Sequence, residues 1–376
     1  MKKILFILRD FKQGGIPRCL ESLMYCIDLK GISIDVCCLH QDGPYKDKLP
    51  NCTILPQDKA LLHLLSFSKG NKNIKTIFYK IIDRGLRQVS SKGLINKRLD
   101  NIAKKLSNKY NAVIAYSEGI AAQLAEKIST PKRFVWIHND YAFDCARGDV
   151  GTSFENFNKI ITVSKATQES FNKVLPQFSD KTLTIYNFIN QIYIEKSADA
   201  YIPDEFSPDF FNIVSVGRIC YQKNFIAIPR IISELSPEIR SKIRWYIIGG
   251  GPKEEVSLLK EEIKKRKVDD NIILLGSIDN PYPYLKRADL FVLTSNYESY
   301  PTVINEALVL ETPILAADIP PVHEMLKDEQ CISEIDKMSA KIDGYIRLTP
   351  PRMAKWTGSE LHNQSVNDNL KILFDE

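Results

Sequence analysis

The chain has 376 residues, of which 44% are hydrophobic and 26% charged. This length is too great for one ordinary α/β domain and suits two of about 150–200 residues each, and the composition excludes a disordered or low-complexity chain. The net charge of +5 is modest, and we expect no nucleic-acid partner.

The N-terminus opens with two lysines and an apolar run that stops at Arg9-Asp10, which is too short for a typical signal peptide. We therefore expect a first β-strand there. No run of 18 or more apolar residues occurs, so no membrane span is predicted. The eight cysteines form no C-x-x-C pair, which favours buried thiols in a reducing compartment, the cytoplasm.

The first half alternates short apolar runs with helical segments, the pattern of a doubly wound parallel sheet covered on both faces. The expected helices are Pro17–Lys30, Ile120–Ile128 and Ala166–Val174. The expected strands are Ile4–Leu8, Ile34–Leu39, Ala112–Tyr116, Phe134–His138, Ile160–Val163 and Leu183–Tyr186.

The pattern stops at 191–210, which contains Pro203 and Pro208 and is predicted to be the linker between domains 1–190 and 211–376. A second α/β set follows, with helices Ile226–Leu235, Lys253–Arg266 and Thr302–Leu310. Its expected strands are Asn212–Val216, Trp245–Ile248, Ile272–Leu275, Leu290–Thr294 and Ile314–Ala317. A last helix near residues 367–374 closes the second domain or packs back on the first. Two Rossmann-like domains facing across a cleft are expected.

Three glycine-containing motifs follow predicted strands. Gly14 and Gly15 precede the first helix and either let backbone amides approach a phosphate or form a plain turn. Gly217 and Arg218, with Lys223 beyond them, place two cations at a strand end, where they can grip a diphosphate or form a solvated basic loop. Gly249, Gly250 and Gly251 follow the next strand and are expected to shape the site through a tight turn.

The most informative motif lies beyond strand Leu290–Thr294. Glu298 is expected in the loop, Pro301 in the first helical turn and Glu306 on the helix. Carboxylates suit the hydroxyls of a sugar or ribose, and the amides of Ser299, Tyr300 and Thr302 suit a diphosphate. The alternative interpretation is a pair of solvated surface glutamates.

Taken together, these residues resemble the signature of retaining family-4 glycosyltransferases of the GT-B fold, from the branch that builds capsular polysaccharide and lipopolysaccharide. The resemblance runs from about Lys2 to about Glu324. It combines Arg218 and Lys223, the glycine turn and the Glu298-x7-Glu306 pair with Gly14-Gly15, Trp136–Asp140, Val163–Lys165 and Tyr186-Asn187. The chain departs from the family at Asp318–Glu324, where prolines replace the usual glycine-containing turn.

The resemblance implies a nucleotide-diphosphate sugar, with UDP expected, as co-substrate and a glycan or lipid-linked glycan as the acceptor bound by the first domain. It implies that Glu298 orients the donor sugar, that Glu306 binds the ribose and that His138 lies at the hydroxymethyl side of the donor sugar or at the reacting centre. As a lone histidine after an apolar strand, His138 could equally be structural. No enzymatic nucleophile is implied.

No Asp-x-Asp motif occurs, so we expect no metal and no cofactor, with Arg218, Lys223 and helix amides stabilising the leaving diphosphate. A non-catalytic GT-B subunit that binds sugar nucleotides and regulates a partner, or a sugar-nucleotide epimerase, remains an alternative. A dinucleotide-dependent dehydrogenase is disfavoured because no G-x-G-x-x-G follows a strand.

A basic stretch, Lys69–Lys109, carries only Asp83 and Asp100 as acids. Its apolar residues fall partly at helical spacing, so it is either a charged helix packed on its own domain or an amphipathic surface that binds anionic lipid. The second interpretation makes the protein peripheral on the inner face of the plasma membrane.

Overall fold

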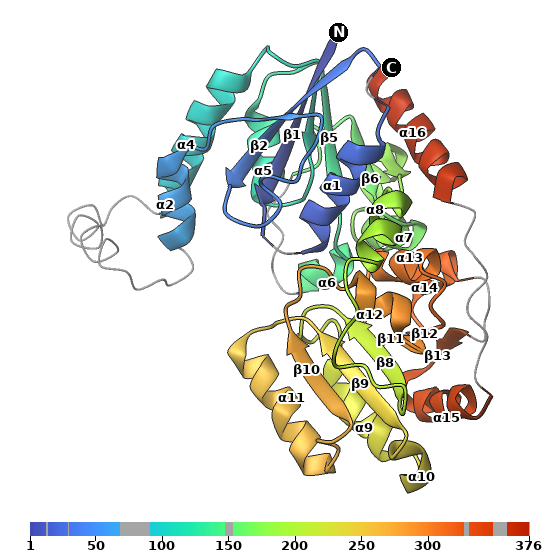
Figure 1. Ribbon diagram of the computed structural model, residues 1–376. Helices are drawn as coiled ribbons and strands as arrows, with labels where there is room; N and C mark the ends of the chain where they lie inside the picture. The colour runs from blue at the N-terminus through green and yellow to red at the C-terminus, as the bar shows by residue number, and fades with distance from the viewer. Residues whose placement is uncertain are drawn as a thin grey trace. The chain divides into compact units, whose positions relative to one another are not determined.

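The computed structural model describes residues 1–12, 14–28, 30–67, 91–146, 153–326, 331–348 and 359–375. The chain divides into two compact units, each built on one parallel sheet (Figure 1). The first unit consists of Met1–Val163, Thr167–Phe188 and Val366–Glu376, and the second of Ser164–Ala166 and Ile189–Ser365.

The sheet of the first unit has seven strands in the order β3-β2-β1-β4-β5-β6-β7. All neighbouring strands are parallel, and Ile4 of β1 lies opposite Ile34 of β2 and Ala112 of β4. The inner strands are apolar because helices cover them, as the sequence pattern predicts. The strands are β1 (Lys2–Asp10), β2 (Ile32–His40), β3 (Thr53–Ile54), β4 (Ala112–Ala115), β5 (Lys132–Ile137), β6 (Lys159–Thr162) and β7 (Thr182–Thr184).

Helices lie on both sides of this sheet. Figure 1 shows α2 (Lys59–Phe67) and α4 (Ser91–Leu106) on the side away from α1 (Gly15–Cys26). Helix α4 packs on α2 and on α5 (Ile120–Lys127). The described part of this unit also contains α6 (Tyr141–Ala146), most of α7 (Lys165–Val174) and η1 (Pro176–Lys181).

The sheet of the second unit has six parallel strands in the order β10-β9-β8-β11-β12-β13. The strands are β8 (Phe211–Val216), β9 (Ile243–Ile248), β10 (Ile272–Gly276), β11 (Leu290–Leu293), β12 (Ile314–Ala317) and β13 (Ile332–Ser333). Both sheets are doubly wound, so the predicted class of two Rossmann-like α/β domains is confirmed.

Two groups of helices cover the second sheet. In one group, α9 (Ile228–Ser233) packs on α11 (Lys253–Arg266) and on α15 (Met338–Leu348), and in the other, α8 (Gln191–Ala198), α12 (Tyr282–Arg287) and α13 (Thr302–Val309) pack together. The other helical elements are η2 (Phe225–Ala227), α10 (Pro237–Arg240), α14 (Pro320–Met325) and η4 (Ile335–Lys337).

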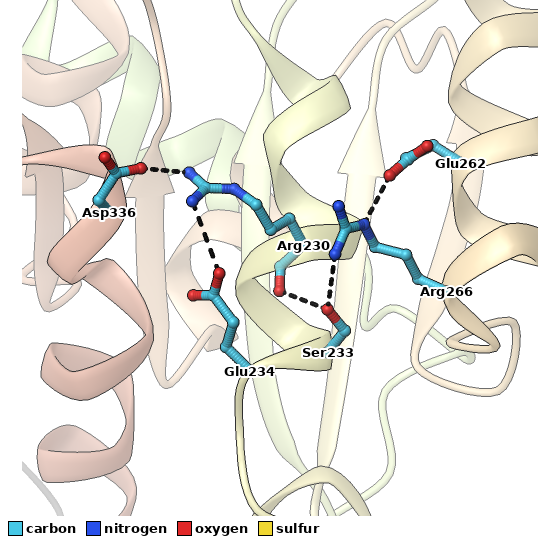
Figure 2. A network of polar contacts seen from close by, with 6 residues as sticks. All are labelled: Arg230, Ser233, Glu234, Glu262, Arg266 and Asp336. Carbon is cyan, nitrogen blue, oxygen red and sulfur yellow. Dashed lines mark hydrogen bonds and ion pairs between the residues drawn. The ribbon is translucent and has the colours of Figure 1, made fainter.

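A polar network joins α9 to α11 and to η4 at the surface (Figure 2). Arg230 of α9 pairs with Asp336 of η4, with Nη2 and Oδ1 2.6 Å apart. Arg266 of α11 donates to the Ser233 hydroxyl at the end of α9 and pairs with Glu262 one turn earlier in its own helix. The network joins α9 to η4 and to α11, which fixes the helix that follows the Arg218–Lys223 loop.

Several elements differ from the sequence prediction. The predicted linker begins with α8, whose Ile194 and Ala198 are buried in the second core. The first helix ends at Cys26 rather than Lys30, because the chain turns extended at Ile27. Strands β3 and β13 were not predicted, since two residues carry no periodic signal.

The last helix, α16 (Ser359–Asp375), packs on the first unit through its second half. Val366 and Leu370, four residues apart on one helical face, are buried. The Asn367 side chain accepts a hydrogen bond from the Asp28 N–H (3.1 Å) and donates one to the Cys26 carbonyl (3.2 Å). Asn367 thereby caps the C-terminal end of α1.

Only part of the basic stretch can be placed. Residues 68–90, with Lys72, Lys75, Lys80 and Arg84, lie outside the described residues. The described part forms α4, whose Leu99 and Ala103 are buried in the first core. No helix among the described residues is long and apolar enough to cross a membrane. All eight cysteines are free thiols, and Cys19, Cys37, Cys38 and Cys331 are buried.

Candidate active site

In the second sheet, β9 follows β8 toward one edge and β12 follows β11 toward the other edge. The winding direction therefore reverses between the two central strands, β8 and β11. Ligands of open α/β sheets bind at the carboxyl ends of the strands at such a switch point. The loop after β8 carries Arg218 and Lys223, and the loop after β11 carries Glu298. The topology therefore places the predicted cations and the predicted carboxylate in loops that follow two neighbouring strands at this switch point.

An ion pair joins the two loops. Lys223 Nζ lies 2.5 Å from Glu298 Oε1, and the two side chains are only 17% and 6% exposed. Ser295 Oγ donates to the same oxygen (2.6 Å), and Gln222 Nε2 donates to Oε2 (3.3 Å). The sequence predicted separate roles for Lys223 and Glu298. The structure shows that they also neutralise and orient each other.

Further hydrogen bonds fix the backbone of the β8 loop against the β11 loop. The Asn296 N–H donates to the Gln222 carbonyl (2.8 Å), and Asn296 Nδ2 donates to the Tyr221 carbonyl (2.7 Å). The Thr294 hydroxyl donates to the carbonyl of Lys223 (2.8 Å). These hydrogen bonds hold the two loops in a fixed arrangement, as a site that must hold charge in fixed geometry requires.

Arg218 differs from Lys223 in being exposed and, within the described ranges, in having no ion-pair partner. Gly217, immediately before it, sits against the Lys223 side chain, because an added Cβ would lie 3.1 Å from Lys223 Cε. Among the described residues, no ion pair has to break before the guanidinium binds an anion.

The glycine turn after β9 packs against the β8 loop. A Cβ on Gly249 would lie 1.8 Å from the Gly217 carbonyl oxygen, and one on Gly251 would lie 2.2 Å from that of Ile219. The Ile219 N–H donates to the Gly250 carbonyl (2.8 Å). This close backbone approach gives the turn a structural reason for its glycines, and ligand contact by Gly249 and Gly250 stays a prediction.

Helix α13 carries the second glutamate. Its first residue is Thr302, so Pro301 occupies the N-cap position rather than the first turn, and no side chain among the described residues caps the helix. Ser299 and Pro301 are buried, while Tyr300 is half-buried and its hydroxyl accepts a hydrogen bond from Asn305 Nδ2 (3.2 Å).

Glu298 and Glu306 are 8% and 5% exposed. A carboxylate is almost never buried unless it is paired or hydrogen-bonded. The interpretation of two solvated surface glutamates is therefore wrong.

The loop that departs from the family pattern also has a physical consequence. Pro320 and Pro321 occupy the first two positions of α14. Proline has no backbone N–H, so neither residue can donate a main-chain hydrogen bond to a ligand there.

In the first unit the winding direction changes between β1 and β4. Gly14 and Gly15 follow β1 and begin α1, whose N-terminus no side chain of the described residues caps. A Cβ added to either glycine would meet no described atom within 4 Å. Packing within the unit therefore gives no reason for glycine here, in contrast to the turn at Gly249.

His138 follows β5, the neighbour of β4. Its ring lies 4.7 Å from that of Tyr116, and its Nε2 is buried with no hydrogen-bond partner among the described residues. Burial lowers the pKa of His138 to about 3, which keeps the imidazole neutral at physiological pH. Ser117, at the end of β4, has a buried hydroxyl that likewise lacks a partner in the described structure.

Sequence reasoning missed several residues of these sites. Ser295 and Gln222 bind Glu298, and Glu118 binds the residues that follow β5. Each of these residues lies in a loop that follows a strand, which was the available signal. The partners of Gln222 and Glu118 lie in other loops, whereas Ser295 and Glu298 belong to the same loop. No group of three or more potential metal ligands was found among the described residues.

Residues 202–353 match the family model described as glycosyl transferases group 1. The chain is 23% identical, over 92% of its length and 89% of the relative, to the N-acetylgalactosamine-N,N'-diacetylbacillosaminyl-diphospho-undecaprenol 4-alpha-N-acetylgalactosaminyltransferase of Campylobacter jejuni. It is 27% identical to the amylovoran biosynthesis glycosyltransferase AmsD of Erwinia amylovora, over 43% of this chain and 45% of that protein.

Solved structures share the fold over the full chain. The structure of Anabaena Alr3699/HepE in complex with UDP and glucose superposes with a TM-score of 0.74 at 15% identity and covers 100% of both chains. Staphylococcus aureus TarM, as a mutant in complex with Fondaparinux, alpha-GlcNAc-glycerol and UDP, gives a TM-score of 0.70 at 15% identity, again over 100% of both chains.

Proposed function

We propose that this chain, a glycosyltransferase of the GT-B fold, transfers a hexose or N-acetylhexosamine from a UDP-sugar to a glycan or lipid-linked glycan, with retention of configuration, in the synthesis of a surface polysaccharide. The match to group-1 glycosyltransferases covers the domain that carries Arg218, Lys223 and Glu298. The Campylobacter relative is named for a lipid-linked acceptor, and the HepE structure holds UDP.

One observation carries the proposal: at the switch point of the second sheet, Lys223 of the β8 loop is paired with the buried carboxylate of Glu298 of the β11 loop, and Arg218 of the β8 loop is exposed. A diphosphate needs positive charge that is fixed before binding, because reorganising charges during the reaction costs free energy. Arg218 supplies a planar donor for two phosphate oxygens, and Lys223 supplies a point charge held by Glu298.

In this mechanism the transition state develops negative charge on the leaving diphosphate. Arg218, Lys223 and the N-terminal amides of α13 stabilise that charge, and each well-placed donor contributes about 3–4 kcal/mol. Glu298, which keeps Lys223 in place, orients the donor sugar through its remaining acceptor capacity. Glu306 binds the ribose, and the neutral His138 contacts the donor sugar. The acceptor hydroxyl attacks on the face from which the diphosphate departs, and a diphosphate oxygen takes its proton.

We propose further that the enzyme works at a membrane surface. The basic stretch Lys69–Lys109 supplies a density of cations that favours anionic lipid, at about 1 kcal/mol for each lysine or arginine near the surface. A lipid-linked acceptor would be presented at the same surface.

The test begins with thermal unfolding in the presence of UDP-glucose, UDP-N-acetylglucosamine, UDP-N-acetylgalactosamine, GDP-mannose and ADP-glucose. A UDP-sugar at 100 times its Kd should stabilise the protein by about 2.7 kcal/mol. Transfer is then followed by NMR of the anomeric proton of the product, with and without EDTA. A product of inverted configuration contradicts retention, and loss of activity in EDTA contradicts metal-free stabilisation of the diphosphate.

The alternative of a non-catalytic sugar-nucleotide-binding subunit predicts binding without turnover. Arg218→Ala should lower kcat/KM about 100-fold, because a donor to the leaving group is lost. Arg240→Ala is the matched control, since Arg240 precedes β9 and therefore lies at the N-terminal ends of the strands, away from their carboxyl ends. If both variants equal the wild type in turnover, Arg218 has no role in transfer.

A further inference from the structure

Two carboxylates hold the turn His138–Asp140 that follows β5. Glu118, in the loop between β4 and α5, accepts a hydrogen bond from Asn139 Nδ2 through Oε1 (2.6 Å) and a longer one from the His138 N–H through Oε2 (3.5 Å). On the other side, Asp140 Oδ1 accepts from Ser170 Oγ (2.8 Å) of α7. The turn is thus fixed from a neighbouring strand end and from a helix.

The residue that this turn carries is His138. Its Nε2 is buried and has no hydrogen-bond partner among the described residues, so no protein hydrogen bond to that nitrogen sets the orientation of the ring. Two restraints that the described residues show are packing against the Tyr116 ring and the position of the His138 backbone. Glu118 acts on the second restraint directly.

We propose that Glu118 is a positioning residue for sugar transfer: it fixes the backbone of His138 and Asn139 so that the imidazole meets the donor sugar in one orientation. The inference rests on the proposed function, because it takes His138 as a contact of the donor. A small misplacement of a group that contacts the reacting substrate lowers the rate of the chemical step more than the affinity for the ground state.

The chemistry of the side chain makes the proposal specific. A carboxylate has two acceptor oxygens and no donor, so it can accept from Asn139 and from His138 together. Glutamine has the same shape but one acceptor oxygen, and its amide group would face one of these N–H donors. Glu118→Gln therefore removes one of the two bonds without opening a cavity.

The kinetic test compares Glu118→Gln with Glu155→Gln, an exposed glutamate of the same unit, using the UDP-sugar that stabilises the protein most. Glu118→Gln should lower kcat by about 10–30-fold and leave KM for the donor within about twofold, and Glu118→Asp, which keeps both acceptors, should recover part of the loss. Equal kcat in Glu118→Gln and Glu155→Gln would overturn the proposal.

A double-mutant cycle with His138→Gln tests whether the effect passes through the histidine. In the His138→Gln background, Glu118→Gln should lower kcat less than about threefold, because the imidazole that Glu118 positions is then already absent. Independent, multiplying losses would show that Glu118 acts elsewhere. Full turnover by His138→Gln alone would instead contradict the assignment of His138 to the donor.

A spectroscopic measurement decides the positioning claim without any substrate. NMR spectra of the histidine rings in 15N-labelled protein should show shifted or broadened His138 signals in Glu118→Gln and unchanged signals in Glu155→Gln. The midpoint of thermal unfolding confirms that the variants are folded. Unchanged His138 signals in Glu118→Gln would refute the positioning role, whatever donor the enzyme uses.

Discussion

Replacement of Lys223 by methionine should destabilise the second domain far more than a typical surface substitution. The change keeps the length of the side chain but leaves the Glu298 carboxylate, 6% exposed, without its cation. Breaking a buried pair on one side costs about 3–5 kcal/mol. Here Ser295 and Gln222 still donate to the carboxylate, so we expect a loss of about 2–3 kcal/mol.

The assay is thermal unfolding followed by calorimetry. For a domain of this size, a loss of 2–3 kcal/mol corresponds to a fall in Tm of roughly 4–12 °C. Lys242→Met is the matched control, because Lys242 pairs with Glu238 at 2.9 Å while both side chains are more than half exposed. An exposed pair of this kind contributes little to stability because solvent screens it, so Tm should change by no more than roughly 2 °C.

The double variant Lys223→Met with Glu298→Gln removes both charges. Its Tm should recover most of the loss, because a neutral pair has no buried charge left unpaired, while transfer stays impaired. Equal Tm shifts for Lys223→Met and Lys242→Met, or no recovery in the double variant, would refute the reasoning that this pair is a buried, mutually dependent unit.

Four further outcomes are expected. Gly249→Ala should destabilise the protein by about 3 kcal/mol or more, because the added Cβ would overlap the Gly217 carbonyl oxygen. Gly14→Ala should leave Tm unchanged and lower the affinity for the donor. Equal losses of Tm in the two variants would contradict the different roles assigned to these glycines. For His138, burial lowers the folded-state pKa from 6.5 to about 3, so between these values the unfolded chain binds a proton that the folded chain does not. Stability should therefore fall as pH drops from about 6.5, by up to about 1.4 kcal/mol per unit, and His138→Gln should flatten this slope in acid denaturation curves. Glu306→Ala should weaken binding of UDP in calorimetry, and unchanged affinity would exclude it as the ribose ligand. The protein should sediment with anionic vesicles at low salt and be released at high salt. Replacement of Lys72, Lys75, Lys80 and Arg84 by glutamate should abolish this binding. If the wild-type protein does not bind anionic vesicles at low salt, the membrane proposal is wrong.

Much of the fold follows from local pattern. Strand Ile314–Ala317 and helix Lys253–Arg266 have the boundaries that their apolar runs and flanking residues predict. Short apolar runs bounded by turn residues are reliable signals because parallel strands are covered on both faces. The signal fails where an element is held by its neighbours rather than by its own pattern, as in the two-residue edge strands β3 and β13 and in helix α8.

The sequence by itself also determined which residue types stand at the strand ends: Arg218 and Lys223 after β8, Glu298 after β11 and His138 after β5. Only the tertiary structure decided how they are used. Lys223 and Glu298 are 75 positions apart, and they meet because the sheet order makes β8 and β11 neighbours. Likewise Gly249 must be glycine because the Gly217 carbonyl lies against it, whereas nothing in the described structure crowds Gly14. The spacing of residues along the sequence cannot predict these contacts, because they depend on which strands are neighbours and on how closely two backbone segments approach in the folded chain.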